Sequence, residues 1–328
     1  MRKVTLGLSG LEVSPIAFGT WQLGGDWGAF DEREAIDAIR FARAQGTNFF
    51  DTAQAYGFGA SERILARALG DELAKGRDQI VIATKGGLRI DAERGLVRDS
   101  SRSWLRTGVE QSLKALEVDH IDLYQVHWPD HETPLAETGA ALQELVDEGK
   151  IGHVGVSNFE PAEMAELARS VTVETLQPPY SMFRRGIEAE ILPYAREHNI
   201  GVLVYGPLAH GLLTGAIGRD GAFTADDWRS TNPIFAGADF ELHLDVVEEL
   251  KRFVGERGHT VSQLAVAWTL RHPAVQVAIV GSRHQRHIAE SIGALELQLS
   301  DEELAEIDRI LSAAGAVAIG GPTPEAMP

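Results

Sequence analysis

The chain has 328 residues, of which 44% are hydrophobic and 24% charged, and its formal net charge is −18. This length allows one large α/β domain or two ordinary domains, and the acidic balance argues against nucleic-acid or anionic-membrane partners, which need a basic face. The absence of cysteine excludes disulfides, thiolate metal sites and a cysteine nucleophile. No run approaches the roughly 18 apolar residues of a membrane helix, so a soluble cytoplasmic protein is expected.

The chain begins with two short alternating runs, at residues 4–6 and 11–13, which flank Ser9-Gly10. This arrangement predicts an N-terminal β-hairpin that closes the base of the domain. From residue 16 onward, short Val/Ile/Leu-rich runs alternate with longer amphipathic segments. The expected strands are residues 16–19, 47–51, 80–85, 121–127, 153–157, 173–177, 201–205 and 277–281. The expected helices are residues 32–45, 60–69, 101–116, 134–148, 161–169, 188–198, 262–271 and 286–294.

These strand–helix units predict an α/β protein built on a (β/α)₈ TIM barrel, which typically needs about 250 residues. Continuous apolar strands are what a parallel sheet covered by helices requires. An open doubly wound sheet is the structural alternative, but it usually carries Gly-x-Gly-x-x-Gly after its first strand. The chain has no such match, since Gly57-Phe58-Gly59 lacks the third glycine. We therefore expect one barrel domain over residues 1–328.

Several segments lie outside these units and predict additions to the barrel. Residues 206–238 form a long loop rich in Gly, Asp and Thr, and such loops are often functional, so we expect a lid. Residues 239–256 predict an extra helix. Ser300 and Glu303 match a capping box that begins a further helix, ending near Leu311. The Ala/Gly/Pro-rich residues 313–328 are expected to form a C-terminal tail.

Four side chains that can donate or orient protons follow apolar runs. Asp51, Lys85 and His127 end the second, third and fourth expected strands, and Tyr56 lies one short loop beyond Asp51. In a barrel of this kind, catalytic groups come from the carboxyl ends of strands and the loops after them. Taken singly, each has a structural explanation: a surface lysine, a hydrogen-bonded histidine, a helix cap and a loop aromatic. Together they predict a site that donates a proton to a carbonyl oxygen.

The same segments resemble the aldo-keto reductases, and most of all the bacterial members of about this length. The resemblance extends, in order and spacing, from the hairpin to residue 311. It implies reversible, nicotinamide-dependent reduction of aldehydes or ketones to alcohols. The matching strings are FFDTAQAYG (49–57), TK (84–85), IDLYQVHW (121–128), GVSNF (155–159), YGPL (205–208) and GLLTG (211–215), with Gly19-Thr20-Trp21 and Gly24-Gly25.

The resemblance implies that Tyr56 is the proton donor. A free tyrosine titrates near pH 10, and an ammonium about 4 Å away is worth roughly 4 kcal/mol at an effective dielectric constant of about 20. We therefore expect the Lys85 ammonium to lower the pKa of the phenol. Asp51 would pair with Lys85 and keep it charged. A neutral His127 would hydrogen-bond the carbonyl oxygen and orient it.

The resemblance also implies how a nucleotide is held. Ser157, Asn158 and Gln177 match the residues that bind the nicotinamide carboxamide, and Tyr205 matches the ring that stacks on the nicotinamide. Glycines of the following loop match the segment over the pyrophosphate, and residues 281–283 match the adenosine phosphate segment. The expected cofactor-binding residues are Thr20, Trp21, Ser157, Asn158, Gln177, Tyr205, Gly206, Pro207, Leu208, Gly211, Leu213, Gly281, Ser282, Arg283, His287 and Glu290.

The charge of this last segment favours NADPH over NADH. A guanidinium at Arg283 suits a 2′-phosphate, whereas an acidic residue at position 282 or 283 would suggest the bare ribose of NAD. Two positions depart from the family pattern, because Ser291 stands where Asn is frequent and His287 where Gln is usual. A simple helix start is the structural alternative for Ser282-Arg283.

The substrate pocket is expected to include Trp21, Trp27 and Trp128, and its ligand to be a small carbonyl or alcohol. No metal site is expected, because Pro129 interrupts the spacing of His127 and His131 and no third ligand is evident. The basic pair at residues 184–185 is expected to be solvated.

Two other functions fit parts of the pattern. The first is a cofactor-binding regulatory or auxiliary subunit with little turnover. The presence of all four polar residues, Asp51, Tyr56, Lys85 and His127, argues against it. The second is a Schiff-base aldolase with Lys85 as its nucleophile, which a partnering Asp51 would oppose because it stabilises the unreactive ammonium. No oligomeric state follows from the sequence.

Overall fold

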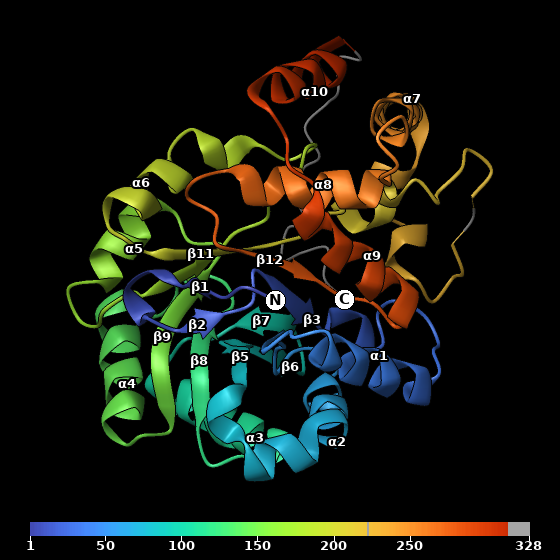
Figure 1. Ribbon diagram of the computed structural model, residues 1–328. Helices are drawn as coiled ribbons and strands as arrows, with labels where there is room; N and C mark the ends of the chain where they lie inside the picture. Colours follow the sequence, from blue (N-terminus) through green and yellow to red (C-terminus); the bar gives the residue numbers. More distant parts are fainter. Residues whose placement is uncertain (222, 314–328) are drawn as a thin grey trace.

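The computed structural model describes residues 1–221 and 223–313 of the chain. Its centre is a closed barrel of parallel strands, which confirms the predicted (β/α)₈ TIM barrel (Figure 1). Around the ring the order is β10 (Thr175–Gln177), β11 (Gly201–Tyr205), β12 (Val277–Val280), β3 (Ile16–Gly19), β4 (Phe49–Asp51), β5 (Val81–Gly86), β8 (Ile121–Val126) and β9 (Ile151–Ser157).

Helices surround the strand ring. They are α1 (Glu32–Ala44), α2 (Ala60–Lys75), α3 (Arg102–Leu116), α4 (Leu135–Asp147), α5 (Pro161–Leu167), α6 (Ile191–Glu197), α7 (Gly237–Gly255), α8 (Val261–Arg271), α9 (Gln285–Gly293) and α10 (Asp301–Ala313). The capping box that begins α10 is confirmed, since the Ser300 and Glu303 side chains each accept a hydrogen bond from the other's backbone N–H. Among the described residues, none of the helices has the length and apolar character needed to cross a membrane.

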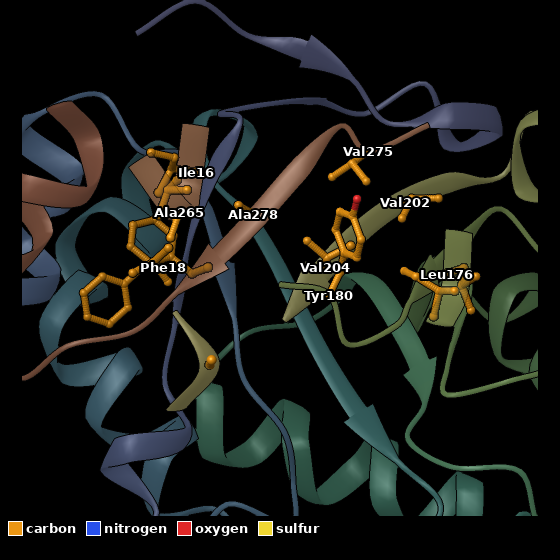
Figure 2. Close-up of a cluster of buried hydrophobic side chains, with 14 of the residues drawn as sticks. Ile16, Phe18, Leu176, Tyr180, Val202, Val204, Ala265, Val275 and Ala278 are labelled. Atoms are coloured by element: carbon orange, nitrogen blue, oxygen red, sulfur yellow. The ribbon is translucent and has the colours of Figure 1, made fainter. Parts of the chain in front are cut away.

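Strand residues alternate between two hydrophobic clusters. Outward-facing strand side chains such as Ile16 and Val204 belong to a cluster that also contains helix residues, among them Ala265 of α8 (Figure 2). Inward-facing side chains such as Phe49, Ala83 and Leu123 form a smaller cluster inside the ring. A period of two residues places every second strand residue on the same side. The next inward positions along these strands are polar: Asp51, Lys85 and Gln125.

The N-terminal hairpin closes the end of the barrel opposite the carboxyl ends of the strands, where Asp51 and Lys85 lie. It consists of β1 (Val4–Thr5) and β2 (Glu12–Val13), joined through η1 (Gly7–Ser9), and it crosses the opening of the ring in Figure 1. Its Leu6 and Val13 side chains belong to the inner cluster. Gly7 has φ +52°, and a Cβ there would stand 2.1 Å from the backbone nitrogen of Gly201, so only glycine permits this approach.

Several helix bounds differ from the sequence-based expectations, as at α2, which ends at Lys75 and not at residue 69. Two larger departures concern the segments that connect the barrel elements. A second hairpin, β6 (Leu88–Asp91) with β7 (Gly95–Arg98), follows β5 and was not expected. The long loop after β11 ends where α7 begins at Gly237, earlier than expected, and it contains η5 (Ala209–Thr214), η6 (Trp228–Ser230) and η7 (Pro233–Phe235). That this loop acts as a lid stays a prediction, and the predicted tail beyond residue 313 lies outside the described residues.

Candidate active site

A buried ion pair lies at the carboxyl ends of β4 and β5. Asp51 is in register with Ala83, and Lys85 follows two residues later on the same side of β5. The Lys85 Nζ atom lies 2.6 Å from Asp51 Oδ1, 2.8 Å from the Thr52 carbonyl oxygen and 3.4 Å from the Tyr56 hydroxyl. Three acceptors thus match the three N–H donors of an ammonium that is only 1% exposed. Burial still lowers the pKa of Lys85, while the Asp51 carboxylate opposes that shift.

Two glutamines hold the other carboxylate oxygen of Asp51. Gln177 Nε2 donates to Asp51 Oδ2 at 2.8 Å, and Gln125 Nε2 donates to the same atom at 3.3 Å. Both glutamines are buried, and Gln177 Nε2 also donates to Gln125 Oε1 at 3.2 Å. Sequence reasoning missed Gln125. Its position two residues before His127, in line with the inward-facing Leu123, is the signal that indicates it.

Tyr56 presents a protonated phenol beside this pair. Burial raises the pKa of Tyr56 well above its ordinary value, and the charges of Asp51 and Asp26 raise it further. The expectation of a lowered pKa for this phenol is wrong, because burial, which disfavours the charged phenolate, has the largest effect. The phenol therefore carries its proton throughout the neutral range.

His127 follows β8 and faces Tyr56. The two rings lie 5.7 Å apart at 81°, and His127 is 5% exposed. Burial, with a smaller effect of the Lys85 charge, lowers the pKa of His127 well below its usual value, so the imidazole is neutral. Its Nδ1 atom is buried without a hydrogen-bond partner among the described residues, which leaves Nε2 as the ring atom available to a ligand.

A cavity of about 450 Å³ opens above these residues and extends to the start of α9. Asp51, Tyr56 and His127 line one end, and Lys85 lies beneath them. Of the other residues predicted from the sequence, the cavity lining includes Thr20, Trp21, Trp27, Trp128, Ser157, Asn158, Gln177, Tyr205, Gly206, Pro207, Leu208, Gly211, Gly281, Ser282, Arg283, His287 and Glu290. Leu213 is absent from the lining, because its side chain is fully buried in the outer hydrophobic cluster.

The residues expected to bind a carboxamide form one hydrogen-bonded chain. Tyr205 donates its hydroxyl hydrogen to Asn158 Oδ1 at 2.9 Å, and Asn158 Nδ2 donates to Ser157 Oγ at 3.0 Å. Ser157 Oγ donates to the Gln177 carbonyl oxygen at 2.8 Å. Asn158 has φ 63°, a left-handed conformation that asparagine tolerates better than most residues. Burial raises the pKa of Tyr205 to about 12, so this phenol is neutral too.

The far end of the cavity contains Ser282 and Arg283 at the end of β12. Ser282 Oγ accepts from the His284 backbone N–H at 3.0 Å and lies 3.1 Å from His287 Nδ1. Arg283 donates to backbone carbonyl oxygens of residues 22–29, at distances of 2.8 to 3.4 Å. Backbone amides and a guanidinium at the start of α9 give this end the chemistry of a phosphate site.

Aromatic rings form the wall beside Tyr56. The Trp21 ring is 6.5 Å from the Tyr56 ring, 5.1 Å from Trp27 and 5.5 Å from Trp228. His210 stands edge-on to Trp228 at 5.0 Å, and burial among the charges of neighbouring arginines lowers the pKa of His210 to about 4. These rings are therefore uncharged, and the Arg229 guanidinium lies 4.7 Å from the centre of the Trp27 ring.

The remaining polar candidates lie apart from the cavity lining. The expectation of a solvated basic pair is wrong: Arg185 makes ion pairs with Glu188 and Asp308, and Arg184 is half-buried beside Tyr205. His131 is largely exposed, near Glu163. Within residues 1–221 and 223–313, no cluster of three or more histidine, aspartate or glutamate side chains could hold a metal ion.

Comparison with known proteins shows where this chain belongs. Residues 15–312 match the model of the Aldo/keto reductase family. Aldo-keto reductase YhdN of Bacillus subtilis (strain 168) is 40% identical over 313 residues, covering 95% of this chain and 94% of the relative. The NADH-specific methylglyoxal reductase of Escherichia coli (strain K12) is 34% identical, covering 92% and 96%.

Two solved structures resemble it as well. The glycerol dehydrogenase AKR11B4 from Gluconobacter oxydans superposes with a TM-score of 0.85 at 39% identity, covering 95% of each chain. An aldo/keto reductase from Klebsiella pneumoniae, in complex with NADP and acetate, has a TM-score of 0.73 at 29% identity, covering 95% and 96%. The chain belongs to the aldo/keto reductase family, and it is an oxidoreductase.

Proposed function

We propose that this protein reduces aldehydes or ketones to alcohols, reversibly, with NADPH as the hydride source and Tyr56 as the proton donor. The observation that carries the proposal is the line of Asp51, Lys85 and Tyr56 at the base of a cavity that ends at Ser282 and Arg283. One end of this cavity supplies a proton, and the other suits a phosphorylated nucleotide.

The protein's own groups would act on the carbonyl oxygen. Neutral His127, through Nε2, would donate a hydrogen bond that orients the carbonyl group. The Tyr56 hydroxyl would then transfer its proton to the oxygen as negative charge develops there. Lys85, 3.4 Å from the phenol oxygen, would stabilise the phenolate that remains, and Asp51 would keep Lys85 positively charged. In the oxidative direction the phenolate would accept the alcohol proton.

The residues at the other end fit a dinucleotide. When bound, the nicotinamide would supply or accept the hydride. Ser157, Asn158 and Gln177 line the same cavity as Tyr56 and offer hydroxyl and amide groups there. Gly206 and Gly211 also line the cavity, and both have positive φ. These features support the proposed binding residues.

The preference for NADPH rests on charge. Ser282 and Arg283 provide a hydroxyl and a guanidinium at the cavity end, and neither position carries an acidic residue. The Klebsiella relative binds NADP, whereas the Escherichia coli relative is NADH-specific. A direct comparison of NADPH and NADH affinity tests this preference, and equal affinities would contradict it.

Turnover separates the proposal from the auxiliary-subunit alternative. Purified protein, NADPH and a panel of small aldehydes and ketones are mixed, and the loss of nicotinamide absorbance is followed. We expect turnover with at least one carbonyl substrate. Tight NADPH binding without turnover across the panel would favour the alternative. A Schiff base on Lys85 is opposed by the 2.6 Å ion pair with Asp51, which stabilises the ammonium.

A further inference from the structure

The Arg283 side chain is hydrogen-bonded to a distant part of the chain. Its Nε and Nη2 atoms donate to the Gln22 carbonyl oxygen at 3.0 and 2.8 Å. Nη2 also donates to the Gly28 carbonyl oxygen at 3.0 Å, and Nη1 donates to that of Ala29 at 3.4 Å. The guanidinium lies 4.7 Å from the centre of the Phe30 ring. One planar group thus contacts both ends of residues 22–30, which we call the wall segment.

The middle of the wall segment is held by the long loop after β11. It contains only the end of the short helix η2 (Trp21–Leu23) and no strand. The Ala29 N–H donates to Asp226 Oδ2 at 3.1 Å, and the Trp228 N–H donates to the Asp26 carbonyl oxygen at 3.1 Å. Both of these contacts come from the long loop after β11. The segment also contacts the barrel, since Leu23 is buried in the outer hydrophobic cluster and Gln22 Nε2 donates to the Gly281 carbonyl oxygen at 3.4 Å. Arg283, just after barrel strand β12, adds the link that reaches both Gln22 and residues 28–29.

The wall segment carries part of the surface that faces Tyr56. Trp27 stands edge-on to Trp21 at 5.1 Å and to Trp228 at 5.6 Å, and Trp21 is 6.5 Å from Tyr56. Trp27 and Arg283 line the same cavity. A shift of the segment would move Trp27 and change the shape of the space beside the proton donor.

We propose that Arg283 is a positioning residue for the substrate wall, a role separate from any charge that it offers to a 2′-phosphate. Its planar guanidinium fixes the wall segment through its own hydrogen bonds, and so it shapes the substrate space whichever nicotinamide nucleotide is present. A charge alone does not reproduce this role, because the contacts depend on directed N–H groups in one plane. The substrate part of this inference rests on the proposed carbonyl reductase activity, whereas the structural part does not.

The structural part is tested on the cofactor-free protein by amide hydrogen exchange. In R283A and in R283K, we expect exchange across residues 22–30 to become at least about 10-fold faster than in the unmodified protein, since a local restraint is lost. R286A is the matched control: Arg286 is also within residues 281–290, but its Nε atom donates to His287 Nε2 at 3.2 Å and not to the wall segment. A thermal melt of each variant confirms that the barrel is folded.

The substrate part is tested by steady-state kinetics with each nucleotide in turn. R283A should raise the KM for the carbonyl substrate by about 10-fold with NADPH and with NADH alike, and change kcat less. Unchanged exchange in cofactor-free R283A, or a defect confined to NADPH, would overturn the proposal and leave Arg283 as a phosphate ligand only. Wild-type exchange in R283K, or an equal increase in R286A, would overturn it as well. Absence of turnover in the unmodified protein would contradict the proposed function without affecting the exchange result.

Discussion

The proton-donating end of the cavity and its aromatic wall are held in different ways. Asp51 and Lys85 belong to adjacent barrel strands, and the strand register alone brings them together. Trp27 and Trp228 belong to loops about 200 residues apart in the sequence, and they meet through side-chain and backbone contacts between those loops. The difference indicates that the barrel fixes the chemistry, while loop contacts fix the shape of the space in which it occurs.

This division has an energetic basis. The strand-end groups are buried and bonded to one another, so removing one leaves another without a partner, which is costly. The wall consists of rings with few hydrogen bonds, so removing one mainly opens space. Substitutions in the two regions should therefore differ in the kinetic parameter that they change.

The largest effect is expected for Tyr56→Phe, which removes only the hydroxyl. We expect kcat for carbonyl reduction to fall by about 1,000-fold, in the middle of the range for loss of a general acid. NADPH affinity, followed by protein fluorescence, should change by less than about 2-fold, a difference worth under 0.5 kcal/mol. Retained turnover would remove Tyr56 from its proposed role and break the contrast between the two regions.

Asp51→Asn should affect both catalysis and stability. The carboxylate accepts from Lys85, Gln177 and Gln125, so an amide in its place leaves the ammonium without its counter-charge. We expect a loss of about 3 kcal/mol in the free energy of unfolding, measured with urea, and a fall of about 100-fold in kcat. Trp228→Ala serves as the comparison. Equal losses of kcat in the two variants would contradict the proposed difference between the strand-end groups and the aromatic wall.

Trp228→Ala should mainly change substrate binding. The ring stacks on Trp21 at 5.5 Å and is 9% exposed, so its removal enlarges the space beside Tyr56 without touching the ion pair. We expect the KM for small carbonyl substrates to rise by about 10-fold, while kcat falls by less than about 3-fold. Steady-state kinetics with substrates of increasing size measures the effect, and the rise in KM should be smallest for the bulkiest substrates.

The pH dependence should be flat through the usual histidine range. The pKa of His127 is lowered, so the imidazole is neutral at every pH above the ordinary pKa of histidine. The pKa of Tyr56 is raised, so the phenol is protonated at every pH below the ordinary pKa of tyrosine. Neither group changes charge between about pH 6.5 and about pH 8. We expect kcat/KM for reduction to be constant across that interval. A rise or fall centred near pH 7 would show that one of these groups is more solvated than the structure indicates.

The smallest effect is expected from metal removal. We expect EDTA dialysis to leave turnover unchanged, because the proposed chemistry uses only side chains and the nicotinamide. His131→Ala should also leave turnover unchanged, since this side chain is largely exposed and near Glu163. Loss of activity that added zinc restores would contradict the proposed site.

The sequence by itself determined the barrel and brought the four polar side chains to one end of it. Apolar runs of strand length, separated by amphipathic helices, are local patterns, and the residue after each run lies at a predictable edge. The sequence alone therefore groups Asp51, Lys85 and His127, and the spacing of Gln125 from His127 is enough to add it to them.

Only the tertiary structure decided the environment of those groups. The direction of the Tyr56 pKa shift depends on how much solvent is excluded from the phenol, which the order of residues does not specify. The contacts between Arg283 and residues 22–29 join segments about 255 residues apart and depend on how two loops pack over the barrel. The β6–β7 hairpin was likewise missed, because its short runs lack the apolar character of the barrel strands and are stabilised by pairing with each other. Burial and long-range packing arise from the whole fold, and local sequence patterns carry little information about them.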